Sequence, residues 1–66
     1  MIFQITDKQK SLFAYLMNST VEDAEIEAAT LCEFYLTETR VYHNGCLLAR
    51  YLCVAGKAVR DDLCQS

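Results

Sequence analysis

The chain of 66 residues contains no proline and only two glycines, Gly45 and Gly56. Two isolated glycines cannot build the glycine-rich loop that cradles a bound phosphate, so no nucleotide-binding loop is expected. The sequence has a single histidine, His43, and no Ser/His/Asp or Cys/His arrangement at a recognisable spacing. We therefore expect a protein that is not an enzyme and that uses no cofactor.

Basic residues are also few. Six Lys and Arg stand against nine Asp and Glu, which gives a formal net charge of −3. Residues 1–33 carry two lysines against six acidic residues and sum to −4, whereas residues 34–66 carry four basic against three acidic residues and sum to +1. Nucleic-acid-binding proteins normally show a basic excess, so nucleic acid is not expected as the partner.

Long apolar runs are absent as well. No stretch approaches the roughly 20 apolar residues that a membrane-spanning helix needs. The first residues, 1–6, contain neither the basic segment nor the long apolar segment of a secretory signal. We therefore expect no membrane association, a cytoplasmic location, and reduced thiols. The four cysteines are Cys32, Cys46, Cys53 and Cys64.

Hydrophobic residues, in contrast, are abundant at 53% of the chain. A protein of this length buries only about 60% of the surface that its unfolded chain exposes, so some of these side chains must lie outside. A contiguous exposed apolar surface usually marks a partner-binding site. The composition thus indicates one domain, residues 1–66, that binds another protein or its own copy.

Apolar spacing predicts an all-α fold, a small three-helix bundle with a short extended segment at the N-terminus. The expected helices cover residues 7–17, 21–36 (or 21–43) and 46–64. The second has the clearest start, because Thr20 lies three residues before Asp23 as in a capping box. The third is predicted from apolar residues that recur at helical spacing over five turns. They are Leu47, Leu48, Tyr51, Leu52, Ala55, Val59 and Leu63.

Residues 37–45 are open to a second interpretation. They can extend the second helix, with Asn44-Gly45 as its left-handed C-cap. They can instead form a strand that ends in an Asn-Gly hairpin turn, because Thr, Val and Tyr favour extended structure. The helical spacing that follows favours the first interpretation, and an α+β fold with a hairpin at Asn44-Gly45 is the alternative.

Two helical stripes are the candidate partner-binding surfaces. Ile26, Thr30 and Phe34 are spaced by four, opposite the core-forming side of the second helix. On the third helix, cysteines and basic residues share one stripe at steps of three and four. The nearby cations could lower the pKa values of the thiols and make them reactive. Alternatively, the cysteines serve only as small apolar packing residues. The candidate contacts are Ile26, Thr30, Phe34, Arg50, Cys53, Lys57 and Arg60. No metal site is expected, because Cys46 and Cys53 would lie about 10 Å apart along a helix.

The sequence therefore predicts an adaptor or inhibitor, of the size typical of small phage or mobile-element regulators. Self-association is expected, with Ile26 and Phe34 paired across a twofold axis and the acidic rim facing Arg50 and Lys57 of the other copy. One alternative is a helix-turn-helix-like DNA-binding regulator that uses Arg40, Arg50, Lys57 and Arg60. A third is a thiol-based redox switch.

Overall fold

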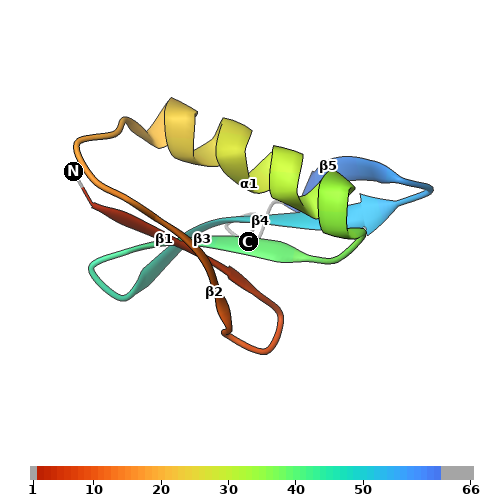
Figure 1. Ribbon diagram of the computed structural model, residues 1–66, viewed down its shortest axis with the longest axis horizontal. Coiled ribbons are helices and arrows are strands. Elements are labelled where there is room, and N and C mark those ends of the chain that lie inside the picture. The colour runs from red at the N-terminus through yellow and green to blue at the C-terminus, as the bar shows by residue number, and fades with distance from the viewer. Residues whose placement is uncertain (1, 62–66) are drawn as a thin grey trace.

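The computed structural model describes residues 2–61 and has an α+β fold (Figure 1). A five-stranded antiparallel sheet has the strand order β2-β1-β3-β4-β5. Helix α1 lies across one face of this sheet, mainly over β3, β4 and β5 (Figure 1). The elements are β1 (Phe3–Asp7), β2 (Leu12–Leu16), α1 (Val21–Tyr35), β3 (Thr39–His43), β4 (Cys46–Val54) and β5 (Lys57–Asp61).

The predicted three-helix bundle is wrong. Residues 7–17 belong to the β1–β2 hairpin, and residues 46–61 form β4 and β5; residues 62–64 of the expected third helix lie outside the described residues. Bulges are one reason for the error, because Phe13 and Leu48 have no partner in their ladders and so break the strict alternation of a strand. β4 is also apolar on both faces, so its adjacent leucines imitate a helical period.

Helix α1 agrees with the predicted second helix. The Thr20 side chain accepts a hydrogen bond from the Asp23 N–H at 3.1 Å, as the capping motif indicated. Glu22 and Asp23 occupy the first turn, where the helix dipole favours negative charge. The helix ends at Tyr35, and its C-cap residue Leu36 is left-handed at φ 55°. Residues 37–43 therefore do not extend the helix.

Two tight turns connect β3, β4 and β5. Asn44-Gly45 has positive φ at both residues, 53° and 79°, as in a type I′ hairpin turn. The alternative interpretation, a hairpin at Asn44-Gly45, is thus what the structure contains. Ala55-Gly56 repeats the same geometry at 54° and 79°. Alanine is a rare choice for a left-handed turn position, so only the glycine of the usual two-residue turn signal is present in the second hairpin.

The core lies between α1 and the middle of the sheet. Small residues on the inner side of α1 allow a close approach to the strands. The core consists of the fully or almost fully buried Phe3, Ile5, Ala24, Ala28, Cys32, Thr39, Val41 and Ala49. The only hydroxyl in this set is satisfied, because Thr39 Oγ1 donates to the Ala28 carbonyl oxygen at 2.8 Å. This core fixes which side of α1 points outward.

Candidate protein-binding surface

The outer side of α1 carries the first predicted stripe. Ile26, Thr30 and Phe34 each follow a buried helix residue by two positions, which places them on the opposite side of the helix. Ile26 is 65% exposed and Phe34 is 74% exposed. Thr30 Oγ1 donates to the Ile26 carbonyl oxygen at 2.9 Å, so its hydroxyl is already satisfied. The stripe is therefore an accessible, mainly apolar line.

Aromatic contacts extend this line toward the sheet. The ring of Phe34 stands edge-on to Tyr35, with centroids 4.8 Å apart. Tyr35 in turn stacks on Phe13 of β2 at 5.0 Å. Leu36, at the end of the helix, is also exposed. The apolar surface thus continues from α1 to the β1–β2 hairpin. Phe13 and Tyr35 were not among the predicted contact residues, because the residues of β2 were predicted to form a helix.

Acidic residues border the apolar line. Helix α1 contains five acidic residues, Glu22, Asp23, Glu25, Glu27 and Glu33, and no Lys or Arg. Two of them contact the sheet: Glu25 accepts hydrogen bonds from Tyr51 and Arg60, and Glu33 accepts one from the Ala58 N–H at 2.9 Å. The other three form no ion pair with any residue in the described range 2–61. The outer side of α1 is consequently apolar along its centre and negative along its edges.

A groove of about 320 Å³ lies between α1 and β4. It is lined by Glu22, Glu25, Ile26, Ala29 and Tyr51. Tyr51 Oη donates to Glu25 Oε1 at 2.9 Å. Burial, followed by this hydrogen bond, raises the pKa of Tyr51 to about 12. The phenol therefore stays protonated at neutral pH and holds one wall of the groove in place.

The second predicted stripe does not exist as one surface. Arg50 and Cys53 are three residues apart on β4, and a strand places such residues on opposite faces. Lys57 follows the Ala55-Gly56 turn at the start of β5, and Arg60 reaches Glu25 of α1 at 3.0 Å. The recognition helix assumed for DNA binding is likewise replaced by β4 and β5. These four residues thus belong to at least two separate surfaces.

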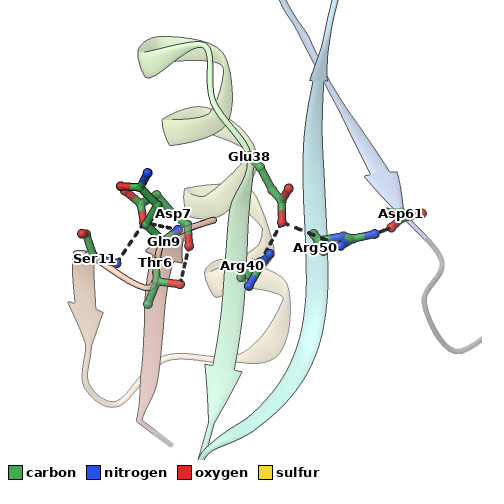
Figure 2. A network of polar contacts seen from close by, with 8 residues as sticks. All are labelled: Thr6, Asp7, Gln9, Ser11, Glu38, Arg40, Arg50 and Asp61. Carbon is green, nitrogen blue, oxygen red and sulfur yellow. Dashed lines mark hydrogen bonds and ion pairs between the residues drawn. The ribbon is translucent and has the colours of Figure 1, made fainter.

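Ion pairs cross the sheet face opposite α1 (Figure 2). Glu38 Oε2 accepts from Arg40 Nε at 2.6 Å and lies 3.8 Å from Arg50 Nη1. Arg50 also pairs with Asp61 on β5. Both guanidinium groups are therefore matched by carboxylates, so neither Arg40 nor Arg50 presents the unbalanced positive charge that phosphate binding requires.

Strand β2 forms one edge of the sheet and pairs only with β1. Its residues 12–16 carry no charge, and Leu12 and Tyr15 are at least half exposed. The opposite edge, β5, carries Lys57, Arg60 and Asp61. Charged residues are a common protection of a free edge against pairing with another chain, and β2 has none.

Cys46 and His43 are cross-strand partners at the β3–β4 turn. His43 Nδ1 donates a hydrogen bond to the Ile2 carbonyl oxygen at 2.8 Å, so the imidazole anchors Ile2 to β3.

No helix within residues 2–61 is long and apolar enough to cross a membrane. Comparison with protein-family models, curated proteins and solved structures gives no match.

Proposed function

We propose that this protein is a non-catalytic binding module that acts as an adaptor or inhibitor of a partner protein in the cytoplasm. The observation that carries the proposal is the outer side of α1, where Ile26 and Phe34 are 65% and 74% exposed between acidic residues. Full burial of each of these side chains by a partner contributes roughly 1.5–3 kcal/mol to the free energy of binding. The unbridged thiols of Cys32, Cys46 and Cys53 fit a reducing compartment.

The chemistry of this surface favours a partner segment that carries both apolar and basic side chains. An amphipathic helix can place apolar side chains on Ile26 and Phe34 while its Lys or Arg residues face the acidic edges of α1. A second copy of the same surface fits less well, because it would bring Glu22, Asp23 and Glu27 of one copy toward the same three acidic residues of the other. Arg50, which we expected to neutralise them, lies on the other face of the sheet and is paired with Asp61.

A designed peptide provides the direct test. A synthetic amphipathic helix with leucines on one side and lysines on the other should bind, and its glutamate counterpart should not. We expect Phe34→Asp to weaken binding at least about tenfold, equivalent to 1.4 kcal/mol, because it removes the main aromatic anchor. Fluorescence anisotropy of the labelled peptide measures the dissociation constant.

Val59→Asp is the matched control, because it adds the same charge to a half-exposed position of β5 on the face opposite α1. It should change the dissociation constant by no more than about twofold, since long-range charge is largely screened at physiological salt. Equal weakening by both variants would mean that only overall charge matters. Circular dichroism checks that each variant keeps its fold. Equal binding of the lysine and glutamate peptides would overturn the proposed partner chemistry.

We also propose that the protein forms a homodimer, at the free edge of β2 instead of at α1. The ladder is regular from Ala14 to Leu16, beyond the bulge at Phe13. Antiparallel pairing of two such edges about a twofold axis places Tyr15 beside its own symmetry mate and Ala14 beside Leu16. This arrangement satisfies the free backbone groups of both strands and covers the exposed Tyr15.

Sedimentation equilibrium at micromolar concentration measures this association. The wild type should sediment at twice the chain mass of 7.5 kDa. Tyr15→Lys should give the monomer, because it places two like charges directly opposite each other across the twofold axis. Val59→Lys, which puts the same charge on the other edge strand, should remain dimeric. A monomeric wild type would contradict the proposal, and a dimer that Phe34→Asp dissociates would place the interface on α1.

A further inference from the structure

Two cysteines from different elements meet where α1 packs on the sheet. Cys32 is fully buried on the inner side of α1, and Cys53 is half-buried on β4. Contacts on either side fix this part of the interface. Glu33 accepts a hydrogen bond from Ala58, the cross-strand partner of Cys53. Two helical turns earlier, Glu25 accepts one from Tyr51, which shares a face of β4 with Cys53.

The two thiols are close enough to influence each other. Burial is the main cause that raises the pKa of Cys32, and the neighbouring Cys53 thiol raises it further through charge and a hydrogen bond. The Cys32 thiol is therefore protonated and uncharged at neutral pH, which suits its position beside an apolar core. Cys46, in contrast, is exposed at the start of β4, at the far end of that strand.

We propose that Cys32 and Cys53 form a dithiol site that closes to an intramolecular disulfide when the protein meets a peroxide. The half-buried Cys53 reacts first: its sulfur attacks a peroxide oxygen, the O–O bond breaks, and a sulfenic acid and water form. Cys32 then loses its proton and attacks the Cys53 sulfur. The S–O bond breaks and a second water leaves, so two thiols and one hydrogen peroxide give one disulfide and two waters.

The product would tie α1 to β4 and enclose residues 33–52. A cross-link of this span restricts the unfolded chain, so it should raise the thermal midpoint of unfolding by about 10 °C or more. The raised pKa of Cys32 keeps the thiolate fraction low, so closure should be slow at pH 7 and faster as the pH rises. A thiol reductant returns the open form.

Mass spectrometry of the peroxide-treated chain tests the site. The mass should fall by about 2 Da, and digestion without reductant should give a peptide pair linked through Cys32 and Cys53. A double variant, Cys46→Ser with Cys64→Ser, should show the same loss and the same rise in the midpoint. Cys53→Ser should show neither.

Three results would overturn the proposal. The first is a linkage that involves Cys46 or Cys64 in place of Cys32. The second is a mass gain of about 32 Da on Cys53, which is over-oxidation to a sulfinic acid without capture by Cys32. The third is a linked wild type whose thermal midpoint is unchanged. Mapping the linkage in the wild type keeps the test valid even where Cys53→Ser fails to fold.

Discussion

Phe3→Ala is expected to unfold the protein at room temperature. Phe3 is fully buried on β1 among Ile5 and Val41, and truncating such a side chain costs about 3–5 kcal/mol. A domain of this length rarely has more than about 3–5 kcal/mol of stability in total, so the loss removes most or all of it. Far-UV circular dichroism should show the loss of sheet and helix, and urea titration should show no cooperative transition.

Phe34→Ala is the matched control for this prediction. It makes the same chemical change on a side chain that is 74% exposed, so the free energy of unfolding should change by less than about 1 kcal/mol. The urea midpoint should stay close to that of the wild type. Similar destabilisation by both substitutions would mean that Phe34 belongs to the core and that the outward side of α1 has been assigned wrongly.

Alkaline pH is expected to destabilise the protein through Tyr51. Its pKa is raised to about 12 in the folded protein, against about 10 for an ordinary tyrosine, so the folded state favours the protonated phenol. The stabilisation is fully present below pH 10 and is lost as the pH rises from 10 to 12. Two pH units correspond to at most about 2.7 kcal/mol. Urea titrations at a series of pH values measure the loss.

Tyr51→Phe should flatten this part of the pH profile, although it also removes the hydrogen bond to Glu25 and so lowers stability at neutral pH. The slope between pH 10 and 12 is therefore the decisive quantity. Identical slopes for the wild type and Tyr51→Phe would show that other groups cause the alkaline destabilisation.

The helix was predictable because its signals are local. Thr20 and Asp23 mark its start within four residues, and the opposite placement of Ile26 and Phe34 follows from helical geometry alone. The exposure of Ile26 and Phe34 was therefore predicted correctly, and their role in partner binding stays a prediction. The Asn44-Gly45 turn is also a local signal, and it was recognised but outweighed by the apparent helical period of β4.

The sheet was not predictable in the same way, because its determinants are distant in sequence or hidden by irregularities. β1 pairs with β3 across the whole of β2 and α1, and no short motif reports such a pairing. The bulge at Leu48 shifts the phase of β4, and Ala55 replaces the residue that normally announces a hairpin. The contacts of Tyr51 with α1 depend on all three features, so the groove could not be found from spacing.

The position of β1 between β2 and β3 has a consequence for how the chain reaches its fold. β3, β4 and β5 follow one another through two-residue turns, so they can assemble rapidly from local contacts. β1 is synthesised before β3, so it must wait for residues 39–43 before its second neighbour exists. Joining them closes a long loop of chain, which makes this pairing the expected rate-limiting step of folding. Until then Phe3 and Ile5 remain in contact with water, and the nascent chain is at its most vulnerable to aggregation.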